Sequence, residues 1–535
     1  RALAAQGKVA AAQTAFDQAI HCVESVRRAI RTDLARTDFF ATQIHIYGAK
    51  IAHALQQGAV EAAFDCTEQA RSRSLLELLA DATIRPPQTL PAELLEQEQR
   101  LRTQWLAVAD QPSPYARMAE QTLDEFYREL QLLAPDYAAL RSALPFTTAQ
   151  ILAQLPPDTA ICAYFGLPDQ LVCFVLTQKH GVTATPLPLT VDKLTSASLD
   201  GTGRPRSLLP TAAGELTDPW LLEKLYGALL EPVFPQLAHC RRLVLLPHGA
   251  LHRLPLHAAY DPQTQQFLCD RFDILYTPSA TIQCARLPQK QAQPQRSGVL
   301  AIAPSAADLV HPRAEARAVA QLCGGAVLVG QAATVHRVLD QAQHYRYLHI
   351  AGHAHFRAEA PLLSGVALAD QHLTAWDLLQ TANVGCALVS INGCESGVSR
   401  VQTGDELVGL VRALLYAVAP SVLLTLWPIQ DLAARVFAQL FYDQINQQPL
   451  TAATRVTHLL RVTVDRFRRL SQAAVCALLL ADGLTAQEID AALAQLPSQR
   501  HSASDQPAPP FAHPYFWAPY LVIGEVWEGG PSLDR

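Results

Sequence analysis

Leu388-Val-Ser-Ile-Asn-Gly-Cys-Glu-Ser-Gly397 is an apolar run typical of a buried strand, followed by a turn of small residues that carries Cys394. A similar unit lies upstream in residues 347–355, Tyr-Leu-His-Ile-Ala-Gly-His-Ala-His, where the apolar run ends at Gly352 and His353. A thiol and an imidazole at two strand ends are the parts of a cysteine nucleophile and its base. We therefore predict that these two strand ends meet in space.

The composition is that of a soluble globular protein of more than one domain, with 535 residues, 50% of them hydrophobic and 17% charged. The net charge is −6 without a basic stripe, so direct nucleic-acid binding is not expected. The 11 cysteines are scattered and form no C-x-x-C pair, which favours a reducing, cytoplasmic setting over a disulfide framework or a zinc cluster. The longest apolar run, 413–427, is too short for a membrane span and contains Pro420.

Residues 1–84 have a helical pattern. Small and aromatic residues from Gly7 to Ala19 have the spacing of the second helix of a tetratricopeptide repeat, so we expect the chain to be cut from a longer protein. A second candidate unit begins at Gly58 but has Thr67 in the aromatic position. The two glycines are 51 residues apart (58 − 7) instead of roughly 34, so an irregular helical bundle is the alternative.

The pattern then changes twice. Prolines at 86 and 87 end the first helices, and residues 85–144 are predicted to form a helical hairpin or linker. From residue 145 strands alternate with helices, and a polar, unpatterned linker near 289–297 separates residues 145–288 from residues 297–528. This alternation predicts an α/β fold with a mostly parallel sheet and helices on both faces. Functional groups of such sheets lie beyond the carboxyl ends of the strands, where Cys394 and His353 both fall.

The second α/β part has the clearest alternation. Its expected strands are 298–303, 326–329, the runs before His353 and Cys394, 421–426 and 519–524. Its expected helices include 312–322, 334–343, 405–418 and 432–445.

The order and spacing of the candidate dyad fit a caspase-like peptidase. His353 precedes Cys394 by 41 residues (394 − 353), near the roughly 50 of caspases. The backbone N–H groups of Cys394 and Ala354 are candidates for an oxyanion hole. Cys394 alone is also compatible with a buried core position, because free cysteine is among the most buried residue types.

Seven motifs in order resemble the CHAT family, caspase- and separase-like proteins found beside tetratricopeptide repeats. They are LLPHGALHRLPLHA (245–258), LHIAGHAHF (348–356), PLLSG (361–365), NGCESG (392–397), GDELVGL (404–410), LWPIQD (426–431) and HPYFWAPY (513–520). The resemblance, which runs from about residue 144 to 527, implies a degenerate caspase-like half over 145–288 and an active CHAT half over 297–528. It assigns the catalytic dyad to His353 and Cys394 and implies no cofactor.

The resemblance also implies how a substrate is chosen. Asp431, after the Leu-Trp motif, would face a basic side chain just before the cleaved bond. Asp405 is a second substrate-binding candidate. Both carboxylates also suit helix capping: Asp431 as an N-cap, and Asp405 beside a capping box at 403–406. The residue after the catalytic histidine is commonly Gly in the family, and here it is Ala354, which narrows the space near the oxyanion.

The expected function is a cysteine endopeptidase acting on a protein substrate and controlled by a protein regulator at the helical region. The alternative is a catalytically inactive interaction scaffold with the same fold. His349, His353 and His355 suggest a metal site, but no matching carboxylate cluster follows, so none is predicted. His349 is expected to be a core histidine with its hydrogen bonds satisfied.

Overall fold

The computed structural model describes the whole chain apart from residues 1, 31–32, 72–89, 109–113, 135–136, 139–140, 142–144, 188, 201–203, 212, 285–295, 305–310, 356–362, 381–384, 393–399, 402–406, 409–413, 416–420, 451–454, 500–507 and 526–535. Cys394 and Asp405 therefore lie outside the described residues, as does the predicted capping box.

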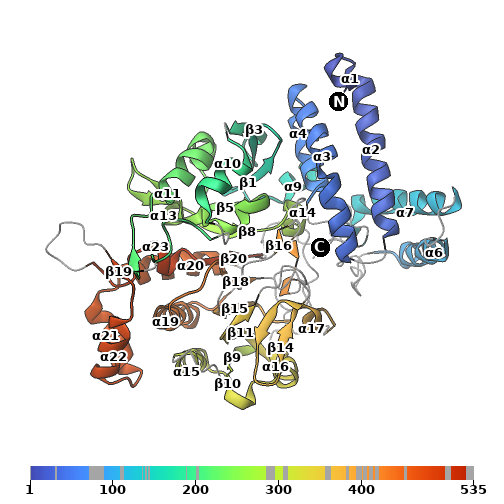
Figure 1. Cartoon of the computed structure of the whole chain (residues 1–535). Coiled ribbons are helices and arrows are strands. Elements are labelled where there is room, and N and C mark those ends of the chain that lie inside the picture. The colour runs from blue at the N-terminus through green and yellow to red at the C-terminus, as the bar shows by residue number, and fades with distance from the viewer. Residues whose placement is uncertain are drawn as a thin grey trace.

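The first described helices pack side by side, namely α2 (Val9–Ala29), α3 (Asp33–Gln56) and α4 (Val60–Gln69) (Figure 1). The short α1 (Ala2–Ala5) precedes them. Gly7 and Gly58 each end one helix and lie just before the next, with φ of +73° and +71°. Only glycine adopts this left-handed conformation without strain, so the two glycines of the predicted repeat units mark helix–helix turns.

The helical hairpin predicted within residues 85–144 is present as α6 (Ala92–Val108) and α7 (Pro114–Leu133), which pack against each other. Glu98 of α6 is almost fully buried. Its carboxylate accepts hydrogen bonds from the Tyr127 and Tyr137 hydroxyls at 2.8 and 2.6 Å. The Arg141 guanidinium donates to it at 2.8 Å, so the buried charge of Glu98 is paired and hydrogen-bonded.

One sheet of eleven strands runs through the rest of the described chain. In spatial order the strands are β10 (Ala326–Val329), β9 (Ser297–Ala303), β11 (Tyr345–Ala351), β15 (Leu388–Asn392), β18 (Val422–Thr425), β20 (Tyr520–Ile523), β8 (Asp273–Tyr276), β5 (Arg242–Leu246), β1 (Thr159–Gly166), β2 (Leu171–Thr177) and β3 (Gly181–Leu187).

Most pairs in this sheet are parallel, as predicted. The five strands from β10 to β18 pair in parallel, and so do β8, β5 and β1. Antiparallel pairs join β20 to β18 and join β1, β2 and β3. The last described strand, β20, thus lies between the two predicted α/β parts, which share a single sheet. Where the domains begin and end stays a prediction.

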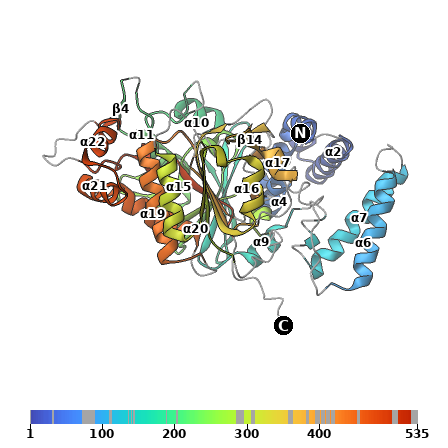
Figure 2. The same cartoon turned by 90° about the horizontal axis from the view of Figure 1, so that it is seen from below.

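Helices cover both faces of the sheet (Figure 2). One layer holds α15 (Pro312–Cys323), α19 (Asp431–Gln447) and α20 (Val456–Arg468), and the other side holds α16 (Val335–Ala342) and α17 (Ala375–Gln380) (Figure 2). In α15, Ala316, Val319 and Ala320 are buried and Arg313 and Arg317 are exposed. This spacing of apolar residues every three or four positions gives the helix its one buried face.

Shorter elements fill the connections. The helices are α9 (Thr148–Gln154), α10 (Val191–Ser198), α11 (Trp220–Leu225), α12 (Phe234–Leu237), α13 (Leu268–Arg271), α14 (Ala280–Cys284), α21 (Gln472–Ala481), α22 (Ala486–Ala494) and α23 (Pro514–Trp517). The strand pairs are β6 (Tyr260–Asp261) with β7 (Gln266–Phe267) and β19 (Ser498–Gln499) with β4 (Glu215–Leu216).

One predicted helix is wrong at its start. Leu407–Val408 is strand β17, paired with β16 (Arg400–Val401), so these two residues are extended where a helix was predicted. The two strands each contain a β-branched valine, which favours an extended backbone over the first turn of a helix. Of the rest of the predicted 405–418 helix, only Leu414 and Leu415 are described, and both are helical.

Three charged residues of the first helical region form hydrogen bonds to the first α/β part. The Asp65 carboxylate accepts from the Thr148 backbone N–H at 2.6 Å, at the start of α9. Glu68 is fully buried and accepts from the backbone N–H of Thr281 at 2.8 Å, at the start of α14. Arg71, also fully buried, donates to the carbonyl oxygens of Tyr164 and Pro247, beside the ends of β1 and β5.

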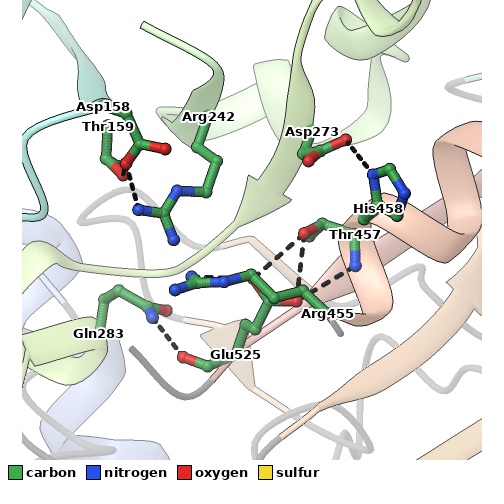
Figure 3. Close-up of polar contacts among 9 residues, drawn as sticks. All are labelled: Asp158, Thr159, Arg242, Asp273, Gln283, Arg455, Thr457, His458 and Glu525. Atoms are coloured by element: carbon green, nitrogen blue, oxygen red, sulfur yellow. Dashed lines mark hydrogen bonds and ion pairs between the residues drawn. The ribbon is translucent and has the colours of Figure 1, made fainter. Parts of the chain in front are cut away.

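A second polar cluster lies at the amino-terminal ends of β1, β5 and β8 (Figure 3). Arg242 pairs with Asp158, and Asp273 accepts from Arg461 at 2.6 Å. Buried Glu525 follows β20 and accepts at 3.1 Å from the backbone N–H and the hydroxyl of Thr457, and its other carboxylate oxygen lies 3.8 Å from Arg455 (Figure 3). The cluster contains three carboxylates and three guanidinium groups, so it is balanced in charge and joins α20 to the sheet.

None of the helices in the described part of the chain is long and apolar enough to cross a membrane. The ten cysteines that the structure describes are all free thiols.

Buried His257 is expected to make the stability depend on pH. Its ring lies against the Tyr276 hydroxyl, 2.9 Å from Nδ1, and burial lowers its pKa to about 4. In the unfolded chain the pKa of a histidine is about 6.5, so unfolding takes up a proton between about pH 4 and pH 6.5. Stability contributed by neutral His257 is complete above about pH 6.5 and falls by about 2 kcal/mol by pH 5.

Urea unfolding at pH 7 and pH 5 measures this. The His257→Asn variant should lose less stability between the two pH values than the wild type, by about 2 kcal/mol. The exposed His336→Asn variant is the control and should match the wild type. Equal losses in all three proteins would contradict the assignment.

Candidate functional site

The candidate site lies at the neighbouring carboxyl ends of β11 and β15. The two strands pair in parallel, with Ala351 opposite Asn392. His353 is two residues beyond Ala351, and Cys394 follows two residues after Asn392 in the sequence. The backbone N–H of Gly352 donates to the Asn392 carbonyl at 3.3 Å and joins the two strand ends. The prediction that these strand ends meet is confirmed, and the position of the Cys394 thiol lies outside the described residues.

His353 and Ala354 stand where β11 leaves the main sheet. His353 is half-buried, and Ala354 begins β12 (Ala354–His355), which pairs with β13 (Gly365–Ala367) and through it with β14 (His372–Thr374). The Ala367 N–H donates to the His353 carbonyl at 2.9 Å. In an antiparallel ladder the next residue then belongs to a pair without hydrogen bonds. The N–H of Ala354 therefore points away from β13.

His349 has the partners of a core histidine, as expected. Its side chain is fully buried, with Nε2 2.9 Å from Glu315 Oε1 and Nδ1 3.2 Å from Ser390 Oγ. Both ring nitrogens are thus engaged by neighbouring side chains. Among the described residues, no group of three His, Cys, Asp or Glu side chains is arranged to hold a metal ion.

Asp431 is not the N-cap of α19, contrary to the capping prediction. The cap is Gln430, whose side-chain oxygen accepts from the Ala433 backbone N–H at 3.0 Å. Asp431 is the first residue of the helix, and its Oδ2 accepts from the His311 backbone N–H at 3.0 Å. The side chain of Gln430 is long enough to reach the backbone N–H of Ala433 from the position before Asp431. The carboxylate of Asp431 is therefore not needed as a cap and can accept a hydrogen bond from outside α19.

The surroundings of Asp431 are strongly charged. His311 Nδ1 lies 3.3 Å from Arg435 Nη1, and Arg435 also pairs with Asp482. Burial lowers the pKa of His311, and the nearby Arg435 lowers it further, while Asp431 acts in the opposite direction. Asp431 itself is only partly buried. Because α19 follows β18, and β18 neighbours β15, Asp431 lies at the same edge of the sheet as His353.

A turn of the first α/β part contacts the segment that follows Cys394, which sequence reasoning missed. The 3-10 turn η3 (Gly249–Arg253) follows β5 and lies against β16, which begins six residues after Cys394 (400 − 394). The turn carries His252 and Arg253, both half-buried. Its signal was present in the sequence as the histidine-rich motif of residues 245–258, but the contact joins segments about 150 residues apart (400 − 250) that no local pattern connects.

The family model described as "CHAT domain" matches residues 220–525. The chain is 26% identical over 312 residues to Tetratricopeptide repeat protein 28 of Mus musculus and 25% identical over 312 residues to the protein of the same name from Homo sapiens. Each match covers 47% of this chain and 12% of the relative, so the chain spans a small part of the relatives' length. Among solved structures, the separase–securin complex of Saccharomyces cerevisiae matches with a TM-score of 0.41 and 11% identity, covering 87% of this chain and 40% of that chain.

Proposed function

The chain belongs to the CHAT domain family, and from this premise we propose that it is a cysteine endopeptidase whose catalytic dyad is His353 and Cys394. The observation that carries the proposal is the parallel pairing of β11 with β15, with Ala351 opposite Asn392. The base and the nucleophile follow these two residues by the same number of positions on adjacent strands.

The proposed reaction proceeds through an acyl-enzyme. His353 takes the proton of Cys394, and the thiolate sulfur attacks the carbonyl carbon of the scissile peptide bond. The backbone N–H groups of Ala354 and Cys394 hold the negative oxygen. His353 then gives the proton to the leaving amine as the C–N bond breaks. A water molecule hydrolyses the thioester, which releases the carboxylic acid and restores the thiol.

The test of this function uses a peptide library made by digesting a proteome. Wild-type protein and the Cys394→Ala variant are incubated with separate portions, and the new amino termini are identified by mass spectrometry. Cleavage that needs Cys394 is the expected result. Identical products from both proteins would reject the proposal.

Asp431 is proposed to select Arg or Lys just before the cleaved bond. Its support is a partly exposed carboxylate at the same edge of the sheet as His353, anchored by the His311 backbone N–H. Asp405 is proposed as a second substrate contact from its motif. A charge-assisted hydrogen bond contributes about 1.5–3 kcal/mol. Losing it should lower kcat/KM for arginine peptides by roughly 10–150-fold.

The Asp431→Asn variant tests this selectivity, because asparagine still offers an oxygen to the His311 N–H. Its kcat/KM should fall for arginine peptides and change little for matched neutral peptides. Asp443→Asn, farther along the same helix, is the control and should keep the wild-type preference. A wild-type preference for acidic or apolar residues at this position would contradict the assignment.

A protein regulator is proposed to bind the helical region formed by α2, α3 and α4. The support is the direct contact between this region and the sheet. Arg71 donates to the Pro247 carbonyl at 3.0 Å, and Pro247 lies two residues before η3, which touches β16. A displacement of α4 would therefore move η3 and, through it, β16, which follows Cys394 in the sequence.

The second candidate function is a catalytically inactive interaction scaffold. It is favoured by the relatives, which are named for tetratricopeptide repeats. In a scaffold Cys394 would react with electrophiles no faster than an ordinary exposed thiol such as Cys22. This difference separates the two functions experimentally.

A further inference from the structure

Asn392, the last residue of β15, uses its whole side-chain amide to contact three other elements. Its Nδ2 donates to Glu315 Oε1 of α15 at 2.8 Å and to the Ala434 carbonyl of α19 at 3.0 Å. Its Oδ1 accepts from the Tyr520 hydroxyl of β20 at 3.1 Å. The amide group can have only this orientation, because exchanging nitrogen and oxygen would place an acceptor against Glu315 and Ala434.

The backbone of Asn392 contacts a fourth element. Its carbonyl accepts from the N–H of Gly352, the residue before His353, at 3.3 Å. This turn is tightly packed, because a Cβ on Gly352 would lie 3.2 Å from the Pro304 ring. Asn392 therefore fixes the end of β15 through its side chain and the residue next to His353 through its backbone.

The acceptor for Asn392 is itself held in place. Glu315 is 2% exposed, and its Oε1 is shared by Asn392 and by His349 Nε2, which lies 2.9 Å away. The His349 ring packs edge-on against the Tyr442 ring with 5.2 Å between centroids. Burying a carboxylate lowers the free energy of unfolding unless its hydrogen-bond partners are held in place. Glu315 and His349 therefore form a fixed support for the Asn392 amide.

We propose that Asn392 is a positioning residue that sets the separation between the Cys394 thiol and the His353 imidazole. The inference rests on the proposed function, because it assigns Asn392 to the same dyad. The side-chain amide of Asn392 is engaged by other protein groups, so we assign it no contact with substrate. Its loss should therefore lower kcat, and a misplacement of about 1 Å corresponds to roughly a 100-fold loss.

Two variants test the inference. Asn392→Ala removes all three side-chain bonds. Tyr520→Phe removes only the hydroxyl donor and keeps the ring, which stacks on Phe437 with 3.5 Å between centroids. Val389→Ala is the matched control, because Val389 lies on the same strand, is fully buried and has no hydrogen-bonding group in its side chain. The readouts are kcat and KM on a peptide from the library, the thermal midpoint, and the rate of Cys394 alkylation by iodoacetamide between pH 5 and pH 9.

Asn392→Ala is expected to lower kcat by roughly 100-fold with KM changed less than about twofold. Its alkylation profile should shift toward that of His353→Ala. Tyr520→Phe should shift both readouts in the same direction by a smaller amount. Val389→Ala should lower the thermal midpoint and leave kcat and the alkylation profile at wild-type values. The double variant Asn392→Asp, Glu315→Gln, which exchanges donor and acceptor, should recover part of the activity that Asn392→Asp alone loses.

The inference is overturned if Asn392→Ala and Tyr520→Phe lower the thermal midpoint but keep the wild-type kcat and alkylation profile. The proposed function survives that result. A wild-type Cys394 that reacts no faster than Cys22, with or without His353, rejects the proposed function and the inference with it.

Discussion

Cys394→Ala is expected to lower kcat/KM for peptide cleavage by roughly 10⁴-fold or more while leaving the fold intact. Alanine has no sulfur to form the acyl-enzyme, so the covalent route is lost. His353→Ala should cost nearly as much, and the double variant little more than either single one, because the base and the nucleophile act as a unit. The measurement is kcat/KM on a peptide identified in the library, with the thermal midpoint recorded for each variant.

Cys386→Ala is the matched control for this prediction. Cys386 is a buried cysteine eight residues before Cys394 (394 − 386), and burial raises the pKa of its thiol to about 12. A thiol that stays protonated at neutral pH is a poor nucleophile. Its loss should reduce stability and leave cleavage unchanged. Cleavage that survives Cys394→Ala, or disappears in Cys386→Ala at a temperature where that variant is folded, would contradict the mechanism.

Arg71→Met is expected to destabilise the protein by about 3–5 kcal/mol, the largest stability effect we anticipate for a single substitution. The substitution leaves the carbonyls of Tyr164 and Pro247 without this donor. It also removes the positive charge near buried Glu68, whose pKa is raised by burial and lowered by Arg71. An uncompensated buried charge is costly, so the pKa of Glu68 should rise further and the carboxylate should take up a proton more readily.

A double-mutant cycle measures this coupling by urea unfolding. Glu68→Gln combined with Arg71→Met should cost less than the sum of the two single variants, because the second change removes the charge that the first leaves unpaired. The exposed Lys8→Met variant is the control for loss of a positive charge and should stay within about 0.5 kcal/mol of the wild type. A loss below about 1 kcal/mol in Arg71→Met would show that the helical region is not anchored through this residue.

The sequence was sufficient to predict the elements that have a strong period. The apolar runs before His353 and Cys394 are β11 and β15, and the predicted helix 312–322 is α15. Their placement side by side followed from the general rule that functional groups lie at the carboxyl ends of parallel strands.

Other features depend on contacts that no local pattern contains. The two-residue strands β16 and β17 exist because they pair with each other, and Leu407 and Val408 of β17 were assigned to a helix. Gln430 replaces Asp431 as the cap of α19, because a glutamine side chain is long enough to reach the free backbone N–H. No role was predicted for Glu68 and Arg71, because their buried hydrogen-bond partners lie more than 90 residues away in the sequence.

The measurement that tests the central claim most directly is the site of reaction with a peptidyl chloromethyl ketone that carries arginine next to the reactive carbon. The wild type is treated with one equivalent, and the modified residue is located by mass spectrometry. The expected result is a single adduct on Cys394, formed at least about 100-fold faster than the adduct on exposed Cys22 and lost in His353→Ala. If the cysteines are modified in the order of their solvent exposure, with Cys22 first and with no effect of His353→Ala, the result would contradict the Cys394–His353 dyad.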